Sequence, residues 1–250
     1  MNEKNKVFAE YKISSFGVPA DVAILRKEGE LIDLYELRHA KLKEATKVAL
    51  DLLKQRVVEG VPVKISELLD PREAEAIKEK IHQKAREIIR VEFGQLLPNE
   101  ENILTGKLIQ EMLGLGDLEL LLSDENLEEI VVNSSHEPVW VYHKEFGWLK
   151  TNVNLQSEEQ ILNYSSIIAR KIGKQITTLS PLLDANLLSG DRVNATLFPI
   201  STKGNSITIR KFAKDPWTMV SLIDASTLNL EVGALCWLAT QYELNVLVGG

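Results

Sequence analysis

The sequence contains very little cysteine. Among its 250 residues there is one, Cys236, within the apolar stretch ALCWLA. A single thiol excludes an internal disulfide framework and any metal site built from several thiolates. The four histidines are scattered without ligand spacing, so we predict no metal site. We interpret Cys236 as a small core residue.

Long hydrophobic runs are also absent. No segment approaches the ~20 apolar residues that a membrane-spanning helix needs. The N-terminal stretch MNEKNKVFAEYK lacks the apolar region of a signal peptide. Hydrophobic residues nevertheless make up 44% of the chain and charged residues 26%, an ordinary globular composition. We therefore expect a cytoplasmic protein with one large or two small domains.

Positive charge is scarce overall but concentrated in one segment. The formal net charge is −7, which argues against general nucleic-acid binding. Residues 170–214 hold eight basic and two acidic residues, so this segment carries +6 and the remainder −13. Such a distribution favours a local anion site over a polyanion-binding surface, although a solvated basic face would give the same composition.

The first half of the chain combines strand and helix patterns. Residues 7–37 contain three short apolar-rich runs broken by turn residues, which predicts strands. Apolar residues at helical spacing predict helices over about 40–58, 70–94 and 103–122. We interpret residues 98–102, PNEEN, as a linker that marks a domain boundary near residue 100.

The second half predicts a strand meander, a helix and two further strands. EEIVV, PVWVYH and WLKTN are the meander, and residues 157–173 begin with a capping pattern typical of a helix. DRVNATLF and SITIRKF alternate as strands do. Asp215-Pro216 reads as a hinge, after which we expect a helix and a last strand, Val246–Val248. The predicted fold class is α+β.

The two predicted strands before the hinge, DRVNATLF and SITIRKF, each carry one arginine at a polar position. Arg192 and Arg210 are separated by the short connection 198–206, so a hairpin would project both side chains from one sheet face. Each guanidinium offers a planar fork of donors that matches phosphate oxygens. Two such groups on one face would suit a phosphate site. From spacing alone, however, pairing of each arginine with a surface carboxylate is the favoured interpretation, and the phosphate site is the alternative.

The C-terminal stretch YELNVLVGG has the pattern with which a phosphate-binding loop begins. In the motif G-x-x-x-x-G-K-[ST], glycines let backbone N–H groups cradle a phosphate and the lysine reaches the terminal phosphates. Gly249 would be the first motif glycine, and the motif lysine and Ser/Thr are absent from these residues. By itself this signal is weak.

Three stretches together resemble the secretion ATPase superfamily, which serves type II and type IV secretion, pilus assembly and the archaellum motor. They are EEIVVNSSHEPVWVYHKEFGWLKTN, LDANLLSGDRVNATLFPIS followed by SITIRKF, and ELNVLVGG. The most specific piece is GDRVN (190–194) followed by ITIRKF (207–212). The opening region, EYKISSFGVPADVAILRKEGELIDLYEL, is similar to the archaeal branch, and the resemblance covers nearly the whole chain.

The resemblance implies a domain plan for the chain. It implies an N-terminal α/β docking region (1–100) with a small sheet and helices, and a PAS-like α/β domain with an antiparallel sheet (101–214). A hinge (215–223) and the first helix and strand of a RecA-like ATPase domain (224–250) would follow. The chain would then be the N-terminal half of such an ATPase, cut at the nucleotide site.

The resemblance also implies a nucleotide site and partners. ATP with Mg²⁺ would lie between the two domains, with Arg192, Arg210 and, less strongly, Arg170 near the phosphates, and Gly249 and Gly250 in the phosphate loop. It favours phosphate contact over surface pairing of the arginines. It further implies a homo-hexamer acting at the cytoplasmic face of the membrane on a platform protein. The negative net charge, not the resemblance, argues against a nucleic-acid partner. The alternative is a non-catalytic interaction module that docks such a platform protein.

Overall fold

The structure is a computed structural model that describes residues 6–40, 42–60, 71–187, 190–212, 217–247 and 249. The chain divides into two compact units, Met1–Phe212 and Ala213–Gly250, and each is described by itself. In the described residues no helix is long and apolar enough to cross a membrane.

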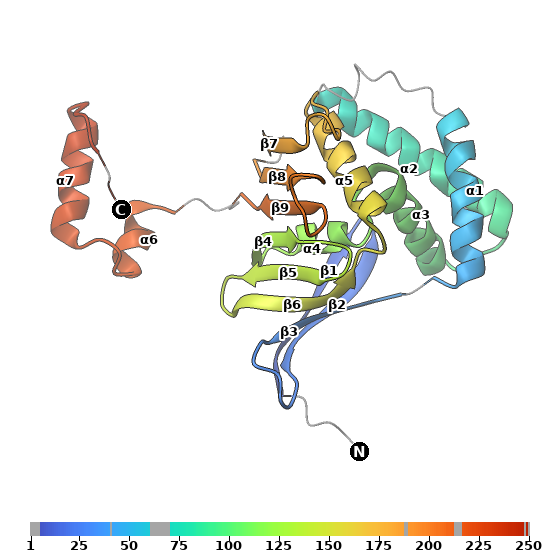
Figure 1. Ribbon diagram of the computed structural model, residues 1–250, viewed down its shortest axis with the longest axis horizontal. Coiled ribbons are helices and arrows are strands. Elements are labelled where there is room, and N and C mark those ends of the chain that lie inside the picture. Colours follow the sequence, from blue (N-terminus) through green and yellow to red (C-terminus); the bar gives the residue numbers. More distant parts are fainter. Residues whose placement is uncertain are drawn as a thin grey trace. The chain divides into compact units, whose positions relative to one another are not determined.

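The first unit is built on one sheet, to which the described residues contribute nine strands in the order β1-β2-β3-β6-β5-β4-β9-β8-β7 (Figure 1). The strands are β1 (Lys6–Ser15), β2 (Val18–Arg26), β3 (Leu34–His39), β4 (Leu127–Val132), β5 (Pro138–His143), β6 (Gly147–Asn154), β7 (Leu182–Asn186), β8 (Arg192–Thr196) and β9 (Ser206–Arg210). Neighbours pair antiparallel except β3 and β6, which are parallel. The α+β class is confirmed.

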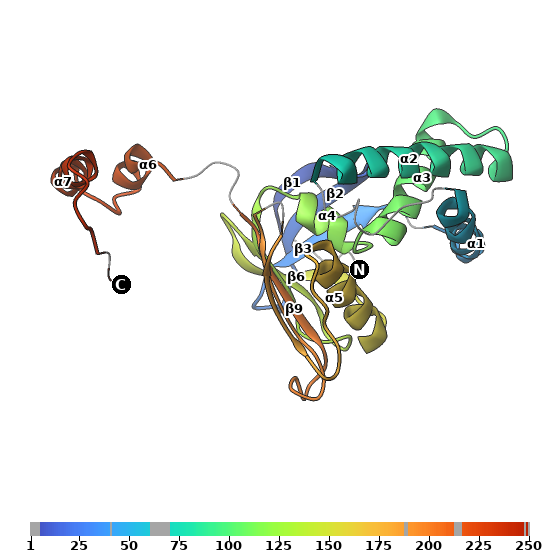
Figure 2. The ribbon, with the colours of Figure 1, turned by 90° about the horizontal axis from the view of Figure 1, so that it is seen from above.

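Two helices cover one face of this sheet, α4 (Leu118–Ser123) and α5 (Glu158–Lys171), and Figure 2 shows them on the same side. Ser157 caps α5, because its side chain accepts a hydrogen bond from the backbone N–H of Gln160. Every second strand residue points into the core beneath these helices. The core includes Ile130, Val141, Leu149, Ile161, Ile168, Val193 and Ile209. The intervening residues of β4–β9 form the other face, which we call the open face.

Three further helices, α1 (Glu44–Gly60), α2 (Pro71–Phe93) and α3 (Pro98–Leu113), have an apolar core of their own. α3 approaches the β1–β2 turn closely at Gly106. A Cβ on this glycine would lie 2.3 Å from the backbone oxygen of Phe16 and 2.7 Å from a methyl of Val18. Glycine at position 106 therefore allows the helical group to pack against the sheet.

The linker predicted at residues 98–102 is wrong, because these residues form the first turn of α3. Pro98 suits the first helical position, where no backbone N–H is needed. The carboxylate of Glu100 accepts a hydrogen bond from the backbone N–H of Leu97 at 3.1 Å, and Glu101 pairs with Arg90 of α2 at 2.9 Å. The polar composition that suggested a linker is that of a capped helix start. Asp70, the first residue of the helix predicted over 70–94, lies outside the described residues.

The second unit contains α6 (Met219–Asp224) and α7 (Leu230–Gln241), each capped by a side chain that accepts a backbone N–H. Residues 219–223 of the predicted hinge are therefore helical, and residues 213–216 lie outside the described part. The expected final strand is not seen at 244–247, which are irregular, and Val248 is not described. A strand needs a neighbour to satisfy its backbone groups, and the described part of this unit offers none.

Candidate functional site

The two predicted site arginines meet on the open face. In the antiparallel register of β8 and β9, Arg192 is the direct partner of Arg210. Their chain neighbours Val193 and Ile209 are buried in the core, so both guanidinium groups project from the opposite face. The predicted hairpin and the shared face are confirmed.

Each of these arginines is paired with a carboxylate. Arg192 forms a bidentate ion pair with Asp184 of β7, in which Nη2 lies 2.9 Å from Oδ2 and Nε lies 3.2 Å from Oδ1. Arg210 Nε lies 3.3 Å from Oε2 of Glu129 on β4. The hydrogen bond from Arg192 holds the pKa of Asp184 below its usual value. The surface pairing left open by the sequence is thus present, and phosphate contact stays a prediction.

Three of the four side chains in these ion pairs are exposed, so the pairs are weakly held. The side chains of Arg192 and Asp184 expose 56% and 60% of their surface, and that of Arg210 exposes 66%. Water and salt screen such pairs, so they contribute little to stability. A phosphate group carries more acceptor oxygens than one carboxylate and could replace both partners at once.

Further polar side chains extend the candidate site along β8 and β9. Asn194 and Thr208 are cross-strand partners one step along the open face from the arginines, and Thr196 pairs with Ser206 beyond them. In the part of the chain that the structure describes, the side chains of Asn194 and Thr208 make no hydrogen bond. The strand pair can therefore present two guanidinium groups and several neutral donors to one anion.

The remaining predicted site residues lie elsewhere. Arg170 is on α5, which covers the face opposite to the two arginines, and its Nε donates to the backbone oxygen of Ser166 at 3.2 Å. Its weaker assignment to the site finds no support in this geometry. Gly249 is exposed in the second unit, and Gly250 lies outside the described residues.

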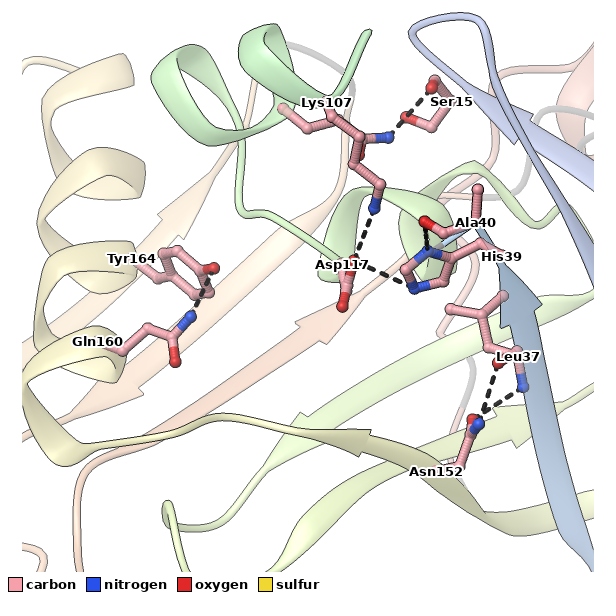
Figure 3. A network of polar contacts seen from close by, with 10 residues as sticks. Ser15, Leu37, His39, Ala40, Lys107, Asp117, Asn152, Gln160 and Tyr164 are labelled. Carbon is pink, nitrogen blue, oxygen red and sulfur yellow. Dashed lines mark hydrogen bonds and ion pairs between the residues drawn. The ribbon is translucent and has the colours of Figure 1, made fainter. Parts of the chain in front are cut away.

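Sequence reasoning missed a polar network that joins the helical group to the sheet (Figure 3). Asp117 Oδ1 lies 3.0 Å from Nζ of Lys107 on α3 and 3.4 Å from Nε2 of His39 at the end of β3. Burial would raise the pKa of Asp117, but His39 and Lys107 outweigh it and hold that pKa well below its usual range. Nothing in the sequence spacing signals this contact, and its role is to tie three elements together.

A second buried cluster centres on Asp124, which follows α4. The hydroxyls of Tyr11 and Tyr35 each donate to its Oδ2 at 2.7 Å, and the backbone N–H of Asn126 donates to Oδ1 at 2.9 Å. Burial, with the neighbouring carboxylate, raises the pKa of both tyrosines far above the ordinary value. The cluster fastens β1 and β3 to the end of α4.

Comparison with known proteins finds relatives of unknown function. No protein-family model matches the chain. Three proteins of Methanocaldococcus jannaschii are similar, each described as uncharacterized: MJ0781 is 39% identical over 127 residues, MJ0900 32% over 157 and MJ1288 32% over 137. These matches cover 51%, 62% and 53% of this chain, but only 18%, 28% and 54% of the respective relatives. The chain thus spans a fifth to about half of their lengths.

One solved structure with partial similarity is the VirB11 ATPase of the Brucella suis type IV secretion system, determined in complex with sulphate. The match has a TM-score of 0.37 and 21% identity, and it covers 45% of this chain and 33% of that one. A superposition this partial assigns no function to the chain.

Proposed function

We propose that this chain is the N-terminal part of an ATPase of the secretion superfamily, in which Arg192 and Arg210 bind the phosphates of ATP. The observation that carries the proposal is their direct cross-strand pairing on the open face, within the motifs GDRVN and ITIRKF. Two permanently charged forks stand on neighbouring strands, and each is held by one carboxylate of the strand beside it, Arg192 by Asp184 and Arg210 by Glu129.

The physical role of the pair is charge neutralisation. Phosphoryl transfer builds charge on the phosphate oxygens, and arginines placed beside them stabilise the transition state. Mg²⁺, a hexameric ring, movement relative to a RecA-like domain and a membrane platform partner belong to the same proposal through the resemblance. The same holds for the predicted place of Gly249 and Gly250 in a phosphate loop and for the predicted domain limits.

The test is ATP turnover and binding by the full-length gene product carrying Arg192→Gln or Arg210→Gln. The matched control is Arg26→Gln. Arg26 on β2 forms a bidentate ion pair with Asp33, in which Nε donates to Oδ1 at 2.6 Å and Nη2 to Oδ2 at 2.9 Å, and its side chain is similarly exposed. We expect kcat/KM to fall about 10²-fold or more for either site variant, as on removal of a charge-stabilising donor. A fall no larger than that of the control would overturn the proposal.

One observation favours the second candidate, a docking module. On α1, Val48 and Leu52 lie one helical turn apart with 60% and 65% of their surfaces exposed. Adjacent exposed apolar side chains suit a protein partner. If Leu52→Glu releases the full-length protein from membranes while both arginine variants keep full turnover, docking is the function of this chain.

A further inference from the structure

The line of residues that contains the two arginines continues across the sheet. In the strand register, Arg192 pairs with Arg210, Arg210 with Glu129, Glu129 with Tyr142 and Tyr142 with Trp148. The chain neighbours that point the other way are buried in the core: Val193, Ile209, Ile130, Val141 and Leu149. Five side chains from five adjacent strands therefore stand in one row on the open face.

The far end of this row is aromatic. The rings of Tyr142 and Trp148 are in edge contact, with centroids 5.3 Å apart and an interplanar angle of 76°. Trp148 nevertheless exposes 48% of its surface. Exposed aromatic rings on an open sheet face are platforms on which nucleobases stack, whatever the base, because every base has a π-face.

The middle of the row is a carboxylate. Glu129 lies between Tyr142 and Arg210, and its side chain is 20% exposed. A carboxylate accepts hydrogen bonds from ribose hydroxyls in many nucleotide sites. Because Oε2 already faces Arg210 at 3.3 Å, Oε1 is the oxygen placed to accept from a sugar.

The length of this row also matches that of an extended nucleoside triphosphate. Neighbouring strands are about 4.8 Å apart, so Tyr142 lies about 10 Å from Arg210 and about 14 Å from Arg192 across the sheet. These separations are comparable with those from the base of an extended nucleoside triphosphate to its middle and outer phosphates. The chemical order, aromatic, carboxylate, guanidinium, guanidinium, is the order base, ribose, phosphates.

We propose that Trp148 and Tyr142 bind the base, and Glu129 the ribose, of the nucleotide whose phosphates Arg210 and Arg192 bind. The proposal rests on the function proposed above and extends it to the rest of the ligand. Base recognition is by stacking alone, so discrimination among purine nucleotides is weak.

The test compares two probes, ATP and inorganic tripolyphosphate, by calorimetric titration of the full-length protein. We expect Trp148→Leu and Tyr142→Leu to weaken ATP binding about ten-fold and to leave tripolyphosphate binding unchanged. The conservative changes Trp148→Tyr and Tyr142→Phe keep a stacking ring and should retain ATP affinity, which separates stacking from loss of fold. Phe198→Leu, an exposed aromatic change in the connection after β8, is the matched control.

The proposed contact of Glu129 with the ribose can be tested separately from the stacking of the base. Glu129→Gln should abolish any preference for ATP over its 2′,3′-dideoxy analogue, while tripolyphosphate binds as well as before or better, because Arg210 loses a competing carboxylate.

The outcomes separate the two proposals. If the arginine variants weaken both probes but the aromatic variants weaken neither, the phosphate site stands and the base site is overturned. Equal weakening of both probes by Trp148→Leu, or weakening of ATP by Trp217→Leu in the second unit instead, also overturns the base site. ATP binding that is independent of both arginines overturns the proposed function.

Discussion

Arg192 and Arg210 are direct cross-strand partners, so two like charges face each other in one antiparallel pair. Such a pair repels unless something neutralises it. Asp184 and Glu129 do so from the strands on either side. The site is therefore a charge-balanced surface whose arginines can exchange carboxylate partners for an anion.

This exchange predicts that removal of one carboxylate strengthens anion binding. Asp184→Asn should tighten tripolyphosphate binding several-fold at low ionic strength, because Arg192 no longer has a competing partner. The measurement is calorimetric titration at low and at physiological salt. Asp33→Asn, which frees the equivalent Arg26 on β2, should change nothing. Unchanged or weaker binding by the Asp184 variant would contradict the exchange.

The close approach of α3 to the sheet at Gly106 predicts that adding one methyl group there strongly destabilises the fold. Gly106→Ala places a Cβ against the backbone oxygen of Phe16, which cannot move away alone. We expect the free energy of unfolding to fall by about 2 kcal/mol or more, as overpacking does. The measurement is denaturant unfolding followed by far-UV circular dichroism. Gly60→Ala is the control, since the atoms nearest to its Cβ belong to the flexible side chain of Lys84, and an equal loss there would refute the explanation.

The elements with strong periodicity could be predicted from sequence. The alternation around Arg192 and Arg210 and the short connection between them were enough to place both side chains on one face. Their partners could not be predicted in the same way. Glu129 reaches Arg210 through the pairing of β4 with β9, and sequence spacing carries no information about which strands become neighbours.

Long-range organisation was the least predictable part. The parallel pairing of β3 with β6 joins residues more than one hundred positions apart and unites the N-terminal strands with the meander in one sheet. The segment 98–102 was misread because helix caps and linkers share the same residue types. Tertiary contacts, such as that of Glu101 with Arg90, decide between the two.

Buried His143 predicts a pH dependence of stability. Its Nδ1 accepts the backbone N–H of Glu145 at 3.1 Å, which leaves the proton on Nε2 of a neutral ring. Burial lowers the pKa of His143, although Asp124 and Glu145 oppose the shift and Lys144 adds to it. The unfolded chain therefore binds a proton more readily than the folded one, and stability is lost as pH falls below the unfolded value of about 6.5.

The measurement is the melting temperature of wild type and His143→Asn between pH 7.5 and pH 5, since asparagine keeps an acceptor near the position of Nδ1. Wild type should lose more stability than the variant over this range. Carboxylates that titrate in acid affect both proteins alike and cancel in the difference. A difference that does not change with pH would show that folding does not lower the pKa of His143.

The proposed function predicts that this 250-residue chain does not hydrolyse ATP by itself. Its sequence holds the arginine pair but no G-x-x-x-x-G-K-[ST] motif, and the lysine of that motif supplies much of the phosphate positioning in such ATPases. We expect phosphate release at the level of the buffer, while the full-length protein turns over. Arg210→Ala distinguishes a contaminant from true activity, because a contaminating ATPase is indifferent to that change. Turnover by the chain that Arg210→Ala abolishes would mean that the arginine face carries catalysis without the phosphate loop.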